Sequence, residues 1–141
     1  MKLRWILPVL AGCAFLPGWA GAHELTVELT GVQHERGQMR VGLYSDPKTF
    51  RKEAQALAVK TAPAIAGEVQ LRFEDLPAGR YAIMAYHDED GNGELNRRFG
   101  MFPAEGYGLS NNPQVSGPPT FEECAFTVPG GGDRLRIELR Y

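Results

Sequence analysis

The sequence predicts an all-β fold, namely an antiparallel β-sandwich of prealbumin or immunoglobulin-like type. Apolar residues alternate with polar residues over several short segments, and stretches rich in Gly, Pro and Asp separate these segments. Six or seven such strands fit into about 120 residues, the size of a single domain. The sequence has no internal repeat, heptad pattern or low-complexity tail. We therefore expect one domain.

Six segments carry the strand signal. Alternation of apolar with polar side chains predicts strands with one buried face at residues 25–29, 39–43, 69–73 and 135–141. The segment "RYAIMAYH" (80–87) is apolar on both faces, which is typical of a central strand covered on both sides. The segment "ECAFTV" (123–128) supplies another strand, which Pro129 and the turn "GGGD" end.

The connections fit this arrangement. "QHERGQ" (33–38) links the first two strands, and "DLPAGR" (75–80) predicts a tight hairpin in which Gly79 supplies a positive φ. The connection over residues 46–68 is longer than a hairpin needs, and "KTFRKEAQAL" within it consists of helix formers after a proline. We expect a short helix or a crossover near residues 48–60.

The first 22 residues are ordered like a secretory signal peptide. A basic start, "MKLRW", precedes an apolar run, and "AGA" precedes "HELTV", so we expect cleavage after Ala22 and a domain of residues 23–141. The apolar run is shorter than the roughly 20 residues of a transmembrane helix. "LAGC" also resembles a lipid-attachment box, so a lipoprotein anchored at Cys13 is the alternative. The expected location is periplasmic or extracellular.

The composition of the expected mature chain bounds its partners. Cleavage removes two of the 15 basic residues, which leaves 13 against 17 acidic ones and a formal charge of −4. Such a domain is a poor candidate for binding nucleic acid or anionic membranes. Cys124 is the single remaining cysteine, so an intrachain disulfide is excluded. We expect a monomer with Cys124 as a buried apolar residue, and a disulfide-linked dimer is the alternative.

An acidic loop, "HDEDGNGELN" (87–96), directly follows the central strand. If Asp88 is position one of a calcium loop, Asp90 is position three, Asn92 five, Glu94 seven with its carbonyl, and Asn96 nine. Oxygens at alternating positions point inward, and two carboxylates this close favour a cation between them. The alternative is an Asp/Asn/Gly turn that needs no metal.

The second half of a calcium loop is missing, because Phe99 stands at position twelve where a bidentate Glu is usual. We therefore expect Ca²⁺ to bind weakly and to have a structural role, unless Glu105 folds over the loop and replaces the missing ligand.

A second polar loop, "PAEGYGLSNN" (103–112), is rich in specific polar groups, which is typical of binding surfaces. Tyr107, Asn111 and Asn112 are candidate contacts for a protein or carbohydrate ligand. For Tyr107, packing of the loop onto the sandwich is the alternative.

Histidine 23 would become the mature N-terminus, and its amine and imidazole suit copper. His34 and His87 are the candidates for the second histidine of such a site, although no spacing brings either near His23. The sequence contains no G-x-S-x-G, Cys–His pair, phosphate-binding glycine loop or CxxC, so no catalytic constellation is expected.

Three long motifs resemble one bacterial family, domain of unknown function 2141. They are "LPAGRYAIMAYHDEDGNGELN" (76–96), "FPAEGYGLSNN" (102–112) and "GPPTFEECAFTV" (117–128). The usual pattern looks like "LPxGxYAxxxxHDxNxNGxLD", then "PxEGYGFSNN" and "PPxFxxAxF". Asn96 and Leu109 depart from it, because Asp and Phe are common there. "LPAGRYAI" is also similar to prealbumin-like and carboxypeptidase-regulatory-like sandwiches.

The resemblance implies an exported β-sandwich and brings no activity, because the family has none assigned. Together with the residues, it favours a non-enzymatic binding or accessory module with a calcium-stabilised acidic loop. The alternative is a secreted copper-binding protein or redox enzyme that uses His23.

Overall fold

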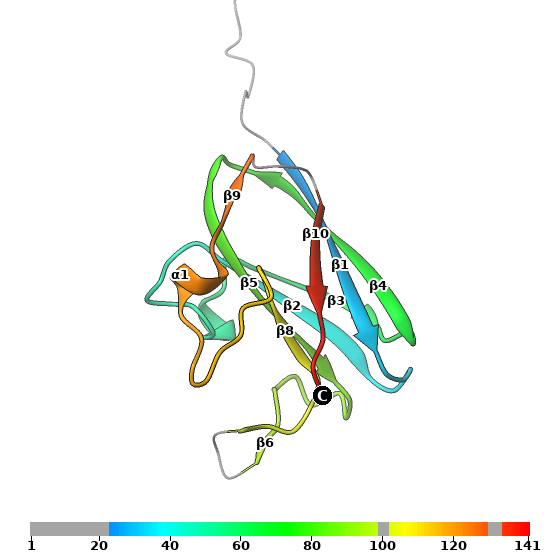
Figure 1. Ribbon diagram of the computed structural model, residues 1–141. Coiled ribbons are helices and arrows are strands. Elements are labelled where there is room, and N and C mark those ends of the chain that lie inside the picture. Colours follow the sequence, from blue (N-terminus) through cyan, green and yellow to red (C-terminus); the bar gives the residue numbers. More distant parts are fainter. Residues whose placement is uncertain (1–22, 99–101, 130–133) are drawn as a thin grey trace, which may run out of the picture.

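The computed structural model describes residues 23–98, 102–129 and 134–141, which form two main sheets and one short ribbon (Figure 1). The expected signal peptide over residues 1–22, the alternative anchor at Cys13, and the turn over residues 130–133 lie outside the described residues. The strands are β1 (His23–Val32), β2 (Gln38–Tyr44), β3 (Ala58–Pro63), β4 (Gly67–Leu76), β5 (Gly79–Asp88), β6 (Arg97–Arg98), β7 (Phe102–Pro103), β8 (Tyr107–Leu109), β9 (Phe126–Val128) and β10 (Arg134–Glu138). The short helices are the 3₁₀ turn η1 (Glu53–Gln55) and α1 (Phe121–Cys124).

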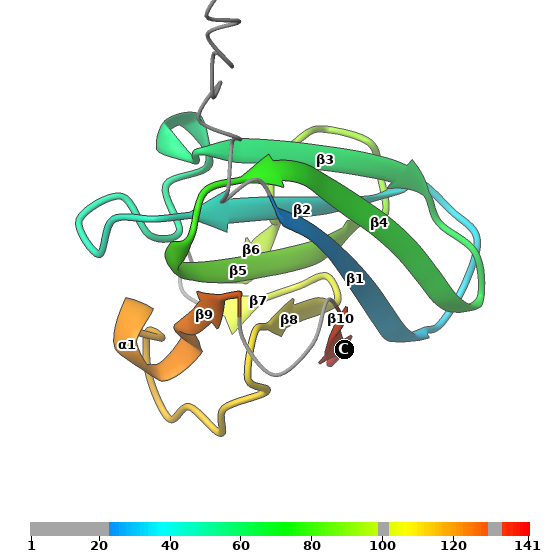
Figure 2. The same cartoon turned by 90° about the horizontal axis from the view of Figure 1, so that it is seen from above.

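The two main sheets confirm the expected all-β sandwich. One sheet has the strand order β10–β1–β4, and the other has the order β3–β2–β5–β8. Strand β9 pairs with the first residues of β5, and β8 pairs with residues 84–86 further along it. Seen from above, β8, β9 and α1 lie beyond β5, on the side away from β2 (Figure 2). Strand β5 is therefore central, as its apolar sequence predicts.

The main core lies between the two sheets. Alternate residues of β1 and β2, such as Val27, Leu29, Val41 and Leu43, have no exposed surface. Their polar neighbours point away from this core, which is the period-two pattern read from the sequence. Burying one large aliphatic side chain contributes about 1.5–3 kcal/mol, so this layer is the chief source of stability.

A second, smaller core covers the other face of the five-stranded sheet. Its buried members are Tyr44, Phe50, Ala82, Leu109, Phe121 and Cys124. They come from β2, β5, β8, α1 and the segment after β2, and this explains why the sequence of β5 is apolar on both faces. Cys124 is fully buried, as its alternation predicts.

Four details differ from the sequence-based expectation. The long connection contains η1 and also a complete strand, β3, which pairs with β2. The expected strand at residues 123–128 begins only at Phe126, because Thr120 and Glu123 form a capping box that starts α1. In the hairpin between β4 and β5, the positive φ of 55° belongs to Asp75 and not to Gly79.

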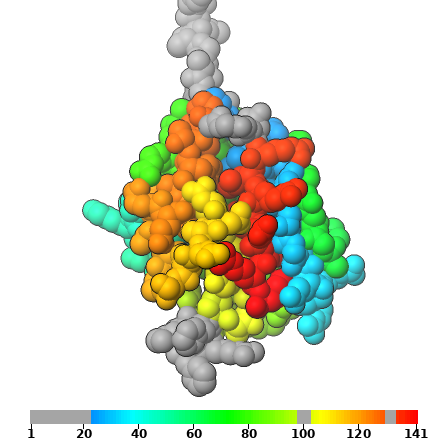
Figure 3. Space-filling model, in the orientation of Figure 1, coloured from blue at the N-terminus to red at the C-terminus, as the bar shows by residue number. Residues whose placement is uncertain are grey.

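The fourth difference is the direction of β10, which pairs with β1 in parallel, whereas all other paired strands of the described residues are antiparallel. In the space-filling view, the C-terminal residues lie between the β1–β4 side and the yellow-to-orange segment that contains β8 and α1 (Figure 3). Among the described residues, no helix is long and apolar enough to cross a membrane.

Candidate functional site

The acidic loop begins where β5 ends. Asp88 is the last residue of β5, and its side chain has no exposed surface. The chain then turns back through Gly91 and Gly93, whose φ values are 69° and 77°. Glycine adopts this left-handed conformation without steric cost, so the two glycines let the loop fold tightly around the Asp88 carboxylate.

The carboxylate of Asp88 organises the loop from inside. Its Oδ1 accepts a hydrogen bond from the backbone N–H of Asn92 at 3.1 Å, and its Oδ2 accepts one from the N–H of Gly93 at 2.8 Å. A buried carboxylate needs such donors to offset the loss of water. Asp88 therefore holds the turn closed.

Asp90 is exposed and is held by side-chain amides. Its Oδ2 accepts a hydrogen bond of 2.8 Å from Nδ2 of Asn96, whose own Oδ1 accepts one of 2.7 Å from Asn92. The Asn96 amide, followed by the backbone N–H of Asn92, lowers the pKa of Asp90 below its usual 3.8. Asp90 is thus ionised at neutral pH and offers its carboxylate oxygens to the amides of the loop.

Glu105 reaches the loop from the segment that follows β7. Its side chain is buried, with Oε2 accepting the N–H of Glu89 at 2.6 Å and Oε1 accepting the N–H of Asn96 at 2.8 Å. Glu105 therefore lies against the acidic loop, at the place where the sequence-based interpretation needs a replacement ligand.

Three carboxylates converge here. One carboxylate oxygen from each of Asp88, Asp90 and Glu105 lies within 4.8 Å of the other two. Asp90 and Glu105 also border a hollow of about 260 Å³, together with Arg36 and Asn96. A carboxylate oxygen that accepts one N–H keeps a further lone pair. The three groups can therefore also act as oxygen ligands for a hard cation.

The other expected ligands lie differently. The side-chain oxygen of Asn92 accepts the backbone N–H of Glu94 at 3.0 Å, so it serves the loop. The exposed side chain of Glu94 lines a second hollow, which is next to Tyr86 and not next to Asp90. The structure thus brings together the three carboxylates, with Asn96 bonded to Asp90, while the Asn92 side-chain oxygen bonds within the loop and the Glu94 side chain lines the second hollow.

The candidate ligand contacts in the second polar loop hold the fold together. Asn111 donates through its amide to the carbonyl of Ala125 at 2.7 Å. The amide of Asn112 donates to the carbonyl of Arg136 at 3.0 Å and accepts the N–H of Glu138 at 2.8 Å. Tyr107 is half-buried and packs against the smaller core. The two asparagines thus connect the end of β8 to neighbouring segments. The position of Tyr107 agrees with the alternative that it packs the loop onto the sandwich.

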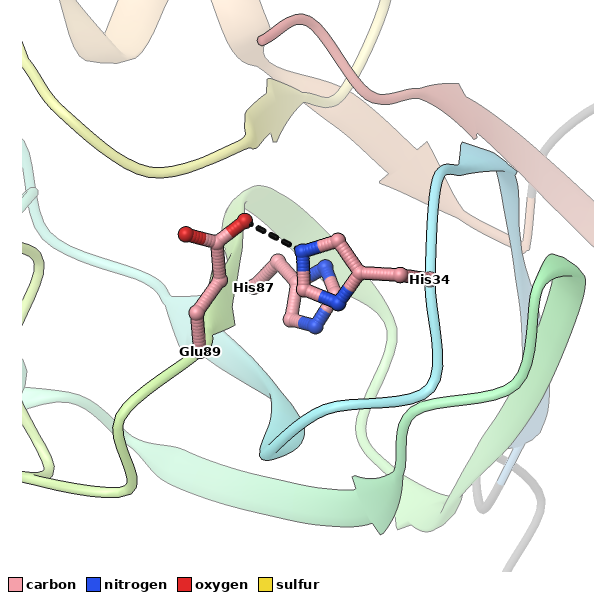
Figure 4. A group of neighbouring side chains, drawn as sticks. All are labelled: His34, His87 and Glu89. Carbon is pink, nitrogen blue, oxygen red and sulfur yellow. Dashed lines mark hydrogen bonds and ion pairs between the residues drawn. The ribbon is translucent and has the colours of Figure 1, made fainter.

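A second cluster combines His34, His87 and Glu89 (Figure 4). The two imidazole rings lie 4.4 Å apart, and Nε2 of His34 is 2.6 Å from a carboxylate oxygen of Glu89. Both nitrogens of the fully buried His87 have partners at 2.6 Å, namely the hydroxyl of Tyr141 and the carbonyl of Arg36. A metal ion at His87 would have to displace one of these hydrogen bonds.

Sequence reasoning treated His34 and His87 only as partners for His23. Strand β1 runs from His23 to Val32, and ten residues of strand span about 30 Å. His34 follows the far end of this strand, next to His87. The structure therefore separates His23 from both other histidines, and it pairs those two with each other.

Two buried groups with nucleophilic atoms are used structurally. Burial raises the pKa of the Cys124 thiol to about 11, with Glu123 adding to the shift. The hydroxyl of Ser110 accepts the N–H of Ile83 at 2.9 Å and donates to the carbonyl of Cys124. Both groups are buried, whereas a catalytic nucleophile is accessible to its substrate and is activated by a base.

Comparison with known proteins gives one match. Residues 27–136 match the model of the family described as "Uncharacterized protein conserved in bacteria (DUF2141)". No curated protein and no solved structure gives a significant match. The matched range begins within β1, ends within β10 and contains the acidic loop. The chain therefore belongs to the bacterial family of domain of unknown function 2141.

Proposed function

We propose that the protein is an exported, non-catalytic binding or accessory module whose acidic loop holds a calcium ion. The observation that carries this proposal is the convergence of Asp88, Asp90 and Glu105, whose carboxylate oxygens lie within 4.8 Å of one another. Oxygen ligands from carboxylates are those that calcium prefers. Export is supported by the basic, apolar and small-residue order of the first 22 residues.

The ion would bind weakly. Two of the three carboxylates already accept two backbone N–H groups each, and the basic residue Arg36 borders the same hollow. The loop also lacks a bidentate Glu at position twelve, although Glu105 supplies a carboxylate from outside it. We expect a Kd of about 10⁻⁴–10⁻³ M, the range of extracellular calcium modules. The role of the ion is structural.

Thermal unfolding of the purified protein tests the proposal. With a Kd of about 1 mM, about 10 mM calcium stabilises the folded state by about 1.4 kcal/mol. The melting temperature should then rise by about 5 °C relative to excess chelator. Magnesium at the same concentration should raise it less, because magnesium demands a stricter octahedral geometry.

Two aspartate variants separate specific binding from a general salt effect. Asp90→Asn removes a converging carboxylate at an exposed position, so the response to calcium should be lost. Asp75→Asn is the matched control, because Asp75 is exposed and precedes the start of β5, whereas the acidic loop follows its end. Equal melting temperatures in calcium and in chelator would leave the acidic loop as an ordinary solvated turn.

A further inference from the structure

A hollow of about 580 Å³ lies on the outer face of the five-stranded sheet, away from the main core. Its floor is formed by outward-facing residues of β2 and β5, among them Gly42 and Tyr86. The segment around η1 and the second half of the acidic loop, from Gly93 to Arg97, also line it. This volume is within the usual range for small-molecule sites.

Tyr44 lines this hollow with an unused hydroxyl group. Its side chain is 2% exposed, and its hydroxyl lies over Gly42, where a Cβ atom would be 3.0 Å from the hydroxyl oxygen. Within the described residues this hydroxyl makes no hydrogen bond. The other buried tyrosines are paired, since Tyr81 donates to the carbonyl of Pro77 and Tyr86 to the carboxylate of Glu53. Every fully buried polar side-chain atom of the described residues has a partner, so the unpaired Tyr44 hydroxyl is open to the hollow.

The hollow also carries an excess of positive charge in an otherwise acidic protein. Three arginines and two glutamates line it, which leaves one formal positive charge. The guanidinium of Arg40 is held by Glu53, which accepts the Tyr86 hydroxyl at 2.6 Å with its other oxygen. Arg51 is exposed and has no carboxylate partner among the described residues. Its guanidinium is thus available to a ligand.

The donor and the charge line the same hollow. Burial raises the pKa of Tyr44 to about 12, so its hydroxyl is a proton donor at neutral pH. The charges of Glu53 and Arg51 both act on this hydroxyl, with opposite signs. Apolar side chains complete the site, because Val59 and Met84 line the hollow next to these polar groups.

We propose that this hollow binds a small organic carboxylate, with the Tyr44 hydroxyl and the Arg51 guanidinium donating to the carboxylate oxygens. The organic part of the ligand contacts Val59 and Met84 on the sheet face. A planar guanidinium with a neighbouring hydroxyl matches the two oxygens of a carboxylate. One formal positive charge fits a monoanion better than a phosphate dianion. The inference does not depend on calcium in the acidic loop.

Titration of the purified protein with benzoate, in excess chelator, tests the proposal. Amide chemical shifts in two-dimensional NMR spectra report the binding. A ligand of this size should bind with a Kd on the order of 1 mM, and the shifts should concentrate on β2, β5 and the residues around Arg51. Benzamide has the same shape without the charge, so it should bind at least about ten-fold more weakly. Tighter binding of inorganic phosphate than of benzoate would overturn the assignment to a carboxylate.

Two variants identify the donors. Tyr44→Phe removes only the hydroxyl and Arg51→Gln only the charge, and each should weaken benzoate binding about ten-fold or more. Arg72→Gln is the control, because Arg72 is exposed on β4 in the other sheet, and it should leave the Kd unchanged. Because the Tyr44 hydroxyl has no partner, Tyr44→Phe should unfold at the same urea concentration as the natural protein or a higher one.

The outcomes against the proposal are equally specific. Absence of saturable benzoate binding would overturn it, as would equal affinities for benzoate and benzamide. An equal loss of affinity in Arg72→Gln would show a non-specific charge effect and would also contradict the site. A lower unfolding midpoint for Tyr44→Phe would mean that the hydroxyl serves the fold and is not reserved for a ligand.

Discussion

The backbone N–H of Asn96 donates a hydrogen bond of 2.8 Å to the carboxylate of Glu105. The two residues belong to different segments, because Asn96 ends the acidic loop and Glu105 precedes β8. The other oxygen of Glu105 accepts the N–H of Glu89, at the start of the loop. The buried side chain of Glu105 therefore connects both ends of the acidic loop to the segment that leads into β8.

Glu105→Gln should destabilise the fold by about 2 kcal/mol, because the new amide NH₂ faces a backbone N–H and leaves it unpaired. Relief of repulsion with the neighbouring Asp88 and Asp90 carboxylates offsets part of the larger loss from the unpaired N–H. Urea unfolding in chelator measures the change. Glu74→Gln, at an exposed position of β4, is the control and should change stability by less than about 0.5 kcal/mol. Equal midpoints for the Glu105 variant and the natural protein would contradict the assigned role.

Much of the sandwich could be predicted because one-sided burial leaves a simple pattern. Val27 and Leu29 alternate with polar residues, and the structure buries them between the sheets. The direction of β10 could not be predicted, because a strand alternates in the same way in parallel and antiparallel pairs. Strand β3 was missed because all six of its residues are exposed or half-buried, so no buried face marks a period of two.

The acidic loop was visible in the sequence because its acids and glycines are close together. The pairing of His34 with His87 was not visible, because they are 53 positions apart in the sequence and only the folded structure brings them together. Tyr44 lies just beyond the strand predicted at residues 39–43, and nothing in the sequence singles it out. The sequence does not tell whether the hydroxyl of a tyrosine has a hydrogen-bond partner. It also does not tell which segments meet around that hydroxyl, so the hollow could be found only in the structure.

Gly37 is required by its conformation and by its neighbour. Its φ is 73°, and a Cβ atom there would lie well inside contact distance of the backbone carbonyl of Asp88. Gly91 has a similar φ of 69° but nothing within 4 Å, so it isolates the conformational cost. Gly91→Ala should cost about 1 kcal/mol, and Gly37→Ala clearly more, because the end of β5 must also move. Equal urea midpoints for the two variants would show that displacing the end of β5 costs no measurable stability.

Strand β9 pairs with residues 79–81 of β5, and β8 pairs with residues 84–86. Ser110 bonds to Ile83, which lies between these two paired stretches. Its hydroxyl accepts the N–H of Ile83 and donates to the carbonyl of Cys124, and the residue has no exposed surface. Ser110→Ala should therefore cost about 2 kcal/mol, because two buried backbone groups lose their partner. Ser116→Ala, at an exposed position, is the matched control. Urea unfolding measures both variants, and similar midpoints would mean that water replaces the hydroxyl.

Cys124 should be protected from thiol reagents in the folded protein. The side chain is fully buried, and burial raises the pKa of its thiol from 9.0 to about 11, so little reactive thiolate is present at pH 8. In a Cys13→Ser variant, which leaves Cys124 as the single cysteine, an aromatic disulfide reagent should react more than 100-fold more slowly than with the peptide in denaturant.

The same shift predicts a loss of stability in alkali. The unfolded thiol ionises near pH 9.0, whereas the folded thiol stays neutral up to about 11, so ionisation increasingly favours the unfolded chain as the pH rises between these values. The Cys13→Ser protein should lose stability between pH 8.5 and about 9.5, where the tyrosines whose pKa burial raises also begin to contribute to the loss. The double variant Cys13→Ser/Cys124→Ala should be less stable at pH 7 because of the lost packing, yet should show a shallower decline. Parallel declines in the two proteins would place the alkaline sensitivity in other groups.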